Sequence, residues 1–283
     1  MTKLTSASTQ ESMADSTTHA QPHTQLSMGE NGVATLWFQR PRQHNAFSDE
    51  TIAEINAHLD HVIEHNQARV LLIQAEGKSF CAGADLQWMK KTISYNQEDN
   101  FNDARALALM LDKLNRLSIP TIAVAQGNAF GGGVGVLCCC DMVFASTDAL
   151  FCFSEVKLGL IPATICPHVV RVIGERAARR YFLSAESFTA TTAKAMGLVT
   201  HLADAKELHT TAQKTAQTIA KYPPNALAGT KALVHKIAAD PMAPDVVDLT
   251  ASTIAKARTS EEAQIALGKF LGQNISGENI EPQ

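Results

Sequence analysis

The chain has 283 residues, of which 45% are hydrophobic and 18% are charged, with a net charge of -4. This length and apolar content are sufficient for one large domain with a sizeable core. The slightly acidic balance leaves no electrostatic footprint for nucleic acid or an anionic membrane, and no apolar run reaches the length of a membrane span. We therefore expect neither nucleic acid nor a membrane as a partner.

The first 28 residues are rich in Ser, Thr, Gln and His and contain few apolar residues. That composition predicts a disordered tail over residues 1–28. A secretory leader would need a basic start and an apolar stretch, and a mitochondrial presequence would be Arg-rich and acid-poor, whereas Glu11 and Asp15 occur here. We therefore expect a cytoplasmic protein.

The next part of the chain is predicted to alternate strands with helices. Short apolar runs are typical of buried strands, and segments with a 3.6-residue apolar period are typical of helices. Strands are expected at 33–38, 70–74, 121–125, 142–145 and 150–153, and helices at 49–65 and 103–117. The second of these helices should end before Pro120.

After Pro162 every predicted element is a helix. Helical periods occur at 169–183, 191–196, 205–221, 225–238, 246–257 and 261–270. Alternating strands and helices followed by helices alone predict an α/β fold with a helical C-terminal region. We place the core at residues 29–200 and the helical region at residues 201–283.

The cysteine and histidine patterns do not indicate a disulfide framework or a metal site. Three of the six cysteines, Cys138–Cys140, are adjacent in an apolar stretch, where their side chains point in different directions. No C-x-x-C spacing suggests zinc, and His58, His61 and His65 are interpreted as part of a solvated helix face. We expect no metal and buried, reduced cysteines.

Two segments place glycine between a strand end and a helix start. They read A-E-G-K-S-F-C-A-G-A-D-L at residues 75–86 and G-N-A-F-G-G-G-V-G at residues 127–135. Glycine allows sharp bends and close approach to the amides, and the first amides of a helix lack internal partners. Two such ends brought together would form a pocket for a developing oxyanion. Taken alone, however, each cluster is more often a tight turn or a close packing contact.

Other glycine-dependent sites are excluded by spacing. A dinucleotide-binding G-x-G-x-x-G fails because Cys138 stands where the third glycine is required. The chain contains no G-x-x-x-x-G-K-[ST] phosphate loop and no G-x-S-x-G nucleophile elbow.

A third segment, F-C-F-S-E-V-K-L-G-L-I-P at residues 151–162, places Glu155 among apolar residues after a strand. Burial without a cationic partner raises a Glu pKa toward neutrality, as a general acid/base requires. The alternative is a solvent-facing Glu155 paired with Lys157. The segment alone does not decide between them.

Together and in this order, the three segments resemble the crotonase, or enoyl-CoA hydratase/isomerase, superfamily over about residues 30–272. The resemblance implies a crotonase-like ββα superhelical core and an acyl-CoA thioester as substrate, without a metal or redox cofactor. It implies that the amides of Ala84 and Gly132 form the oxyanion hole and that Glu155 moves protons. It also implies a homotrimer or a dimer of trimers, with the C-terminal helices serving oligomerisation and covering the active site.

The same resemblance implies binding roles for further residues. Arg42 and Ala46, within R-P-R-Q-H-N-A, match the coenzyme A-binding strand end. The residues that match the path of the coenzyme A arm are Ala82, Gly83, Asp85 and Leu86. Phe270 in the last helix matches a residue that reaches coenzyme A from a neighbouring subunit. The residues matching the substrate pocket are Gly135, Pro162 and His168.

The chain departs from the two-glutamate hydratases at Gly135, which stands where they carry their first catalytic glutamate. A lone Glu155 is similar to the Δ3,Δ2-enoyl-CoA isomerases, in which one base carries a proton between two carbons. The runs F-G-G-G-V-G-V-L-C-C-C-D and F-C-F-S-E-V-K-L-G-L more closely resemble bacterial methylglutaconyl-CoA hydratases of leucine catabolism. We therefore expect hydration of 3-methylglutaconyl-CoA or a related 3-branched enoyl-CoA, with isomerisation as the alternative.

A non-catalytic RNA-binding role is the remaining alternative, because a mitochondrial relative of this superfamily is known as a binder of AU-rich RNA. The sequence pI of about 6.2 and the lack of a basic aromatic patch argue against it.

Overall fold

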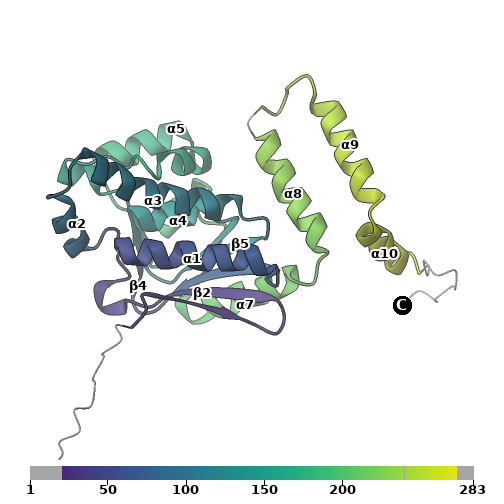
Figure 1. The fold of residues 1–283 in the computed structure, drawn as a ribbon, viewed down its shortest axis with the longest axis horizontal. Helices are drawn as coiled ribbons and strands as arrows, with labels where there is room; N and C mark the ends of the chain where they lie inside the picture. The colour runs from purple at the N-terminus through teal and green to yellow at the C-terminus, as the bar shows by residue number, and fades with distance from the viewer. Residues whose placement is uncertain (1–20, 239, 273–283) are drawn as a thin grey trace, which may run out of the picture.

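The computed structural model describes residues 21–238 and 240–272 (Figure 1). Over these residues the strands form a six-stranded and a four-stranded sheet. The six-stranded sheet has the order β1-β2-β3-β5-β7-β10, and the four-stranded sheet has the order β4-β6-β8-β9. The strands are β1 Thr24–Met28, β2 Val33–Phe38, β3 Val70–Ala75, β4 Ser79–Cys81, β5 Thr121–Ala125, β6 Asn128–Phe130, β7 Met142–Ser146, β8 Leu150–Cys152, β9 Phe188–Thr189 and β10 His201–Ala203.

The α-helices alternate with the strands through most of the chain. They are α1 Asp49–His65, α2 Leu86–Thr92, α3 Gln97–Arg116, α4 Gly132–Cys139, α5 Cys166–Ser184, α6 Ala190–Ala195, α7 Ala205–Ile219, α8 Pro224–Ile237, α9 Val246–Arg258 and α10 Glu261–Phe270. Local signals begin several of them: Ser48 caps α1, Asp85 caps α2, and Asn96 forms a capping box with Asp99 at α3.

The large sheet is buried on both faces. Helices α1 and α3 belong to the core cluster on one face, and α7 packs against β3, β5 and β7 on the other. All residues of β3 and β5 are buried. This double coverage explains why these strands are continuous apolar runs rather than alternating ones. Strands β2, β3, β5, β7 and β10 run parallel, and β1 is antiparallel to β2.

A ββα unit repeats three times along the chain. Strand β3 leads to β4 and the helices α2 and α3, β5 leads to β6 and α4, and β7 leads to β8 and α5. The first strand of each pair lies in the large sheet and the second in the small sheet. This arrangement confirms the predicted crotonase-like α/β fold.

The prediction of a disordered tail over residues 1–28 is wrong for residues 24–28. Strand β1 pairs antiparallel with β2, from Thr24 opposite Phe38 to Met28 opposite Ala34. The carboxylate of Glu54 also accepts hydrogen bonds from the backbone amides of His23 (3.2 Å) and Thr24 (2.7 Å). Strand β2 follows directly in the chain, whereas Glu54 lies about 30 positions away, and the polar composition of the segment indicated neither contact. Residues 1–20 lie outside the described residues.

The predicted boundary between residues 200 and 201 is also wrong. Strand β10 pairs parallel with β7 in the large sheet, and α7 packs on that sheet. The helix pattern after Pro162 missed β9 and β10 because each is only two or three residues long. The helical C-terminal region therefore consists of α8, α9 and α10.

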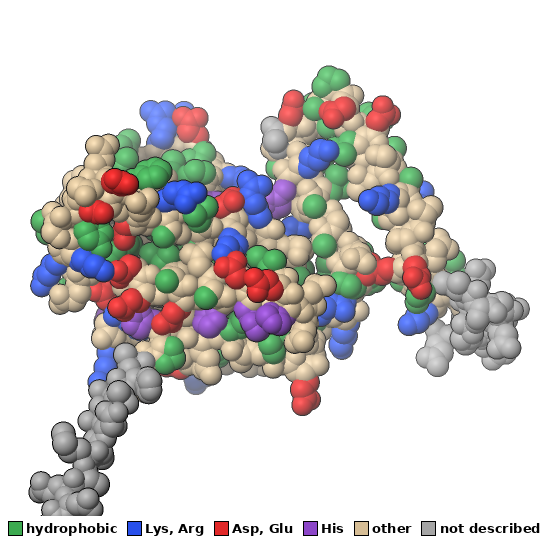
Figure 2. All heavy atoms as spheres, in the orientation of Figure 1, with side chains coloured by type: hydrophobic (Ala, Val, Ile, Leu, Met, Phe, Trp, Pro, Cys, Tyr) green, Lys and Arg blue, Asp and Glu red, His purple; other side chains and the backbone are tan. Residues whose placement is uncertain are grey.

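These three helices stand apart from the sheets as an arm (Figures 1 and 2). Helices α8 and α9 bury no residue among those described, and α10 buries Gly268. Apolar side chains such as Val247 and Phe270 are 75% and 86% exposed. Within the described part of the chain, no helix combines the length and apolarity that crossing a membrane demands.

Candidate active site

The three segments that carry chemistry meet at one edge of the small sheet. Strands β4, β6 and β8 run parallel and adjacent, and each is followed by one of the segments. The carboxyl ends of parallel strands lie at the same edge of a sheet, where the loops that follow them converge. The hydrogen bond from the Gly131 amide to the Cys152 carbonyl (2.9 Å) joins two of these loops.

Sharp turns after β4 and β6 aim two backbone amides into the same space. Gly83 and Gly131 have φ angles of 94° and 49°, which residues other than glycine rarely adopt. The amides of Ala84 and Gly132 follow these turns, and neither donates a hydrogen bond to any described residue. Gly132 is the first residue of α4, whose dipole adds positive potential there. The two amides can therefore receive an anionic oxygen.

Glu155 begins the short 3-10 helix η2, Glu155–Leu158, directly opposite the second turn. A Cβ atom on Gly131 would lie 3.1 Å from Glu155 Oε1, which shows how closely the carboxylate approaches this backbone. Glu155 Oε2 is buried and has no hydrogen-bond partner among the described residues. Burial raises the pKa of the Glu155 carboxyl above its usual range.

The solvent-facing interpretation of Glu155 is therefore wrong. The described residues show no ion pair between Glu155 and Lys157. Burying a carboxylate without a counterion costs folding free energy. Such a group is therefore a candidate for a functional role.

Glu155 faces an inner cavity of about 340 Å³. Apart from Glu155, the described lining consists of backbone, apolar side chains and the hydroxyls of Ser154 and Thr164. The apolar residues with large side chains are Phe47, Leu86, Trp88, Met89, Leu107, Leu158, Leu160, Ile161, Pro162 and Ile165. The turn residues Gly83, Ala84 and Gly132 line the same cavity. Such a lining fits a hydrocarbon chain.

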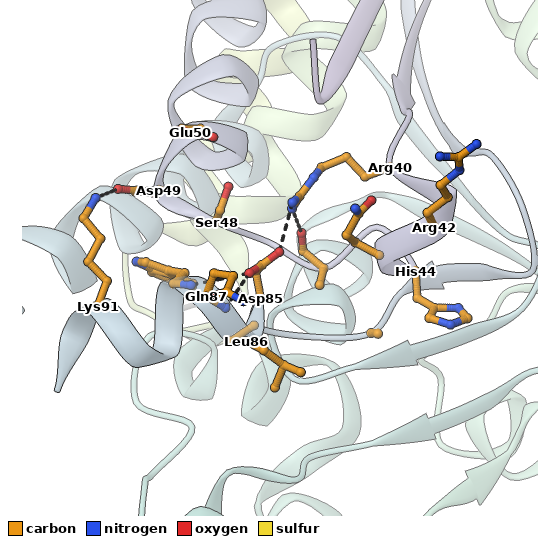
Figure 3. Close-up of a pocket in the computed structure, with 15 residues that line it drawn as sticks. Arg40, Arg42, His44, Ser48, Asp49, Glu50, Asp85, Leu86, Gln87 and Lys91 are labelled. Carbon is orange, nitrogen blue, oxygen red and sulfur yellow. Dashed lines mark hydrogen bonds and ion pairs between the residues drawn. The ribbon is translucent and has the colours of Figure 1, made fainter. Parts of the chain in front are cut away.

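A larger outer pocket of about 760 Å³ adjoins the inner cavity (Figure 3). Its lining carries seven charged or ionisable side chains, namely Arg40, Arg42, His44, Asp49, Glu50, Asp85 and Lys91. Ala46 also lines it, so five of the residues predicted to bind coenzyme A, namely Arg42, Ala46, Ala82, Asp85 and Leu86, lie together here. The two spaces share Ala82, Ala84, Leu86 and Trp88. One extended ligand can thus occupy both.

Arg40 was not singled out by its sequence context, yet it organises the outer pocket. Its guanidinium donates to the Asp85 carboxylate (3.0 Å) and to the Ala46 carbonyl (2.9 Å) (Figure 3). Asp85 in turn accepts from the Gln87 amide (2.7 Å). These hydrogen bonds, with those of the Arg40 guanidinium, keep the pKa of the Asp85 carboxyl below its usual value despite burial. The network holds the loop that carries the Ala84 amide.

Gly135, predicted to line the substrate pocket, does not line the inner cavity, because Ile165 covers it. A Cβ atom at Gly135 would lie 2.3 Å from Ile165 Cγ2 and 3.7 Å from Leu111 Cδ1. Both Gly135 and Ile165 are buried, and Ile165 itself lines the cavity. An isoleucine methyl therefore lies where a first glutamate side chain would begin.

Two other predicted site residues also lie away from the cavities. His168 on α5 is half-buried outside the inner lining, and burial together with the charge of Arg171 lowers the pKa of its imidazole. Phe270 is exposed on α10 and lines neither space. Pro162, by contrast, lines the inner cavity as predicted.

The histidines of α1 do not form a metal site. The rings of His61 and His65 stack with centroids 4.0 Å apart on an exposed face. Among the described residues, no group of three His, Cys, Asp or Glu side chains is arranged to hold a metal ion.

Comparisons with known proteins agree with this geometry. The model of the enoyl-CoA hydratase/isomerase family matches residues 28–274. A putative enoyl-CoA hydratase of Thermus thermophilus is 30% identical over 71% of this chain and 80% of its own, and a mevalonyl-coenzyme A hydratase of Aspergillus fumigatus is 33% identical over 72% and 74%. The crystal structure of a putative enoyl-CoA hydratase/isomerase (crotonase) from Legionella pneumophila aligns with a TM-score of 0.85 and 41% identity, covering 89% of this chain and 97% of that one. The chain belongs to the enoyl-CoA hydratase/isomerase family.

Proposed function

We propose that the protein hydrates a 2-enoyl-CoA that is branched at C3. The single observation that carries this proposal is the half-buried Glu155, whose enclosed Oε2 has no partner among the described residues, beside two free amides at an apolar cavity. The cavity fits the acyl group, the two amides fit the thioester oxygen, and the polar outer pocket fits the rest of coenzyme A.

The amides of Ala84 and Gly132 stabilise the reaction intermediate. When water adds at C3, electron density moves to the thioester oxygen, which becomes an enolate oxyanion. Preorganised donors in a dry site contribute about 3 kcal/mol each to such a step. The α4 dipole acts in the same direction, because its positive end lies at Gly132.

Glu155 is then the one group placed to move protons. As a carboxylate it accepts a proton from the attacking water, and as the acid it returns that proton to C2. Its raised pKa suits both roles, since the two forms come closer in energy near neutral pH. One base acting on one face of the substrate requires syn addition of hydrogen and hydroxyl.

The lining of the inner cavity supports an uncharged acyl chain. No described lining residue is a Lys, Arg or His that would pair with a distal carboxylate, and Glu155 would repel one. The relative named as a mevalonyl-coenzyme A hydratase supports the same choice, because a mevalonyl group carries a C3 methyl and no free carboxylate. Within the predicted pair, this favours a neutral 3-branched chain over 3-methylglutaconyl-CoA.

Hydration rates for a panel of enoyl-CoA thioesters test the proposal. We expect 3-methylcrotonyl-CoA to be hydrated with a higher kcat/KM than unbranched crotonyl-CoA or 3-methylglutaconyl-CoA, whose acyl group carries a free carboxylate. A preference for 3-methylglutaconyl-CoA would overturn the neutral-chain assignment and leave the hydratase assignment standing. If no thioester of the panel is hydrated, both the neutral-chain assignment and the hydratase assignment are overturned.

One observation favours a second candidate, Δ3,Δ2-enoyl-CoA isomerisation. Ile165 covers Gly135, so the site presents a single carboxylate, and one base suffices to carry a proton between C2 and C4. A reaction in heavy water separates the two candidates. Hydration places deuterium at C2 and a new hydroxyl at C3, whereas isomerisation of a 3-enoyl-CoA yields the conjugated thioester without adding water.

The assembly that fits this site is a homotrimer or a dimer of trimers. The exposed apolar side chains of α8, α9 and α10 support it, because a lone chain would leave them in water. Phe270 would then reach coenzyme A bound to a neighbouring subunit. Sedimentation at micromolar concentration tests this assembly, and a stable, active monomer would contradict it.

A further inference from the structure

Trp88 occupies the junction between the two spaces of the site. It lies on α2, is half-buried, and lines both the outer pocket and the inner cavity. Of the residues shared by the two spaces, Ala82 and Ala84 have small side chains and Leu86 is 73% exposed. Trp88 is therefore the one large, partly enclosed side chain beside which a ligand must pass from one space to the other.

The indole of Trp88 is held by a carboxylate from another helix. Trp88 Nε1 donates to Asp103 Oδ1 at 2.9 Å across 15 positions of sequence. Asp103 belongs to α3, which one turn later supplies Leu107 to the wall of the inner cavity. Helix α3 thus carries both part of the cavity wall and the acceptor that orients the indole.

Asp103 has no ion-pair partner among the described residues, and Lys91, the cation whose charge acts on it, is itself paired with Asp49. Within the described part of the chain, its contact with a side chain is the hydrogen bond from Trp88. Burial raises the pKa of the Asp103 carboxyl, so its placement costs free energy. A carboxylate kept there at a cost, with a neutral indole as partner, indicates that the orientation of the ring matters.

The backbone of α2 is anchored at both ends. The Trp88 amide approaches Asp85 Oδ1 at 3.4 Å, and Asp85 is paired with Arg40. At the other end, Lys91 forms an ion pair with Asp49 of α1 (Figure 3). With the helix and the ring both held, Trp88 presents a fixed apolar wall to both spaces.

We propose that Trp88 contacts the substrate where the coenzyme A arm joins the acyl thioester, and that Asp103 is the positioning residue that orients the Trp88 ring. The inference rests on the proposed function, because it requires an acyl-CoA to span the two spaces. The indole then shields the thioester from water beside the Ala84 amide. Loss of its orientation weakens productive binding of the thioester without removing either amide or Glu155.

Substitutions at Asp103 and Trp88 separate orientation from folding. Asp103→Asn keeps an oxygen acceptor, whereas Asp103→Leu removes it and keeps the branched shape, and Trp88→Phe removes the donor. Losing one hydrogen bond of about 1 kcal/mol lowers kcat/KM roughly fivefold in Asp103→Leu and in Trp88→Phe, mainly through KM. Asp103→Asn should stay within about twofold of the wild type, and the Asp103→Leu/Trp88→Phe double variant should be no worse than either single variant.

Fluorescence gives a readout that does not depend on turnover. The chain has 2 tryptophans, so Trp37→Phe leaves Trp88 as the sole tryptophan. Trp37 stacks on His209 away from the site and lines neither space. Saturating butyryl-CoA, a thioester that cannot be hydrated, should quench or blue-shift Trp88 emission and raise its anisotropy. In the Asp103→Leu variant, the emission anisotropy without ligand should already be lower.

Calorimetry on the same samples measures the binding of butyryl-CoA independently of Trp88 emission, so a missing emission change can be told apart from missing binding. Binding of butyryl-CoA with no change in Trp88 emission would overturn this inference and leave the proposed function intact. No binding of butyryl-CoA would overturn the proposed function and this inference with it. Binding with the emission change, together with rescue by Asp103→Asn, would support the assignment of both residues.

Discussion

The inner cavity and the outer pocket share a wall but differ sharply in charge. Among the described residues, Glu155 is the only ionisable side chain lining the inner cavity, whereas seven such side chains line the outer pocket. The Glu155 carboxyl in the inner cavity has no ion-pair partner among those residues, so burial shifts its pKa. The charged groups of the outer pocket are paired or hydrated. Under the proposed function, the chemistry takes place in the inner space, and the outer space recognises the polar part of coenzyme A.

The most severe test of this contrast is Glu155→Gln, which keeps the shape and removes the base. A positioned general base contributes about 10²–10⁴-fold, so kcat should fall by at least about 100-fold while KM changes little. Steady-state kinetics with 3-methylcrotonyl-CoA measure both. A variant that keeps most of its turnover would show that another group moves the proton.

Removing one oxyanion donor should have the next largest effect. Gly132→Pro deletes the amide at the first position of α4, where a proline ring is tolerated, and should lower kcat by about 10²–10³-fold. Gly132→Ala is the matched control, because it keeps the N–H and its Cβ would meet Phe47 Cδ2 at an ordinary 3.4 Å. Circular dichroism must first show that the proline variant is folded. Equal rates for the two variants would place the oxyanion hole elsewhere.

The covered position at Gly135 should respond in stability rather than in rate. A Cβ there would lie 2.3 Å from Ile165 Cγ2, so Gly135→Ala should destabilise the fold by about 1–3 kcal/mol. Ile165→Ala added to it removes the clashing methyl and should recover part of the lost stability. Urea denaturation measures both differences. If Gly135→Ala leaves the free energy of unfolding unchanged, α4 and Ile165 are packed less tightly than this short distance indicates.

The raised pKa of Glu155 predicts how stability changes with pH. The folded state binds the Glu155 proton more tightly than the unfolded chain, whose group has the ordinary value of 4.5, so this residue's contribution falls as pH rises from that value through the folded pKa. Glu155→Gln removes the penalty. Its Tm should exceed that of the wild type at pH 8, and the difference should vanish by about pH 4. A constant difference across this range would rule out the buried charge as its cause.

The smallest expected effect lies in the outer pocket. Arg42 is exposed and forms no ion pair among the described residues, so Arg42→Ala should raise KM by about two- to fivefold and leave kcat unchanged. Added salt should reduce the difference, because it screens exposed charges. Lys90→Ala is the control, since Lys90 is an exposed cation of α2 that lines neither space. An equal effect of both variants would indicate general charge attraction rather than a site.

Much of the inner site was predictable from local sequence. Glycine at 83 and 131 reports a backbone that other residues rarely adopt, and the apolar runs at 70–74 and 121–125 report the buried parallel strands β3 and β5. The three-residue strands β4 and β6, which lie directly before the two turns, were not predicted. Glu155 follows a further apolar run, at 150–153. These signals are local, and the parallel pairing of β4, β6 and β8 then brings the three segments together.

Other features were decided by contacts between residues distant in the chain. The pairing of Arg40 with Asp85 joins positions 45 residues apart, and in the large sheet His201 of β10 pairs with Phe144 of β7, 57 residues earlier. Ile165 fills the place beside Gly135, which the sequence shows only as a missing carboxylate. Composition and apolar periodicity are properties of one segment at a time, so they do not reveal which side chains of a second segment pack against it. Sequence alone therefore determined the three candidate segments and their order, whereas tertiary packing decided how many carboxylates face the inner cavity, which charged side chains line each space and which residues form the wall between them.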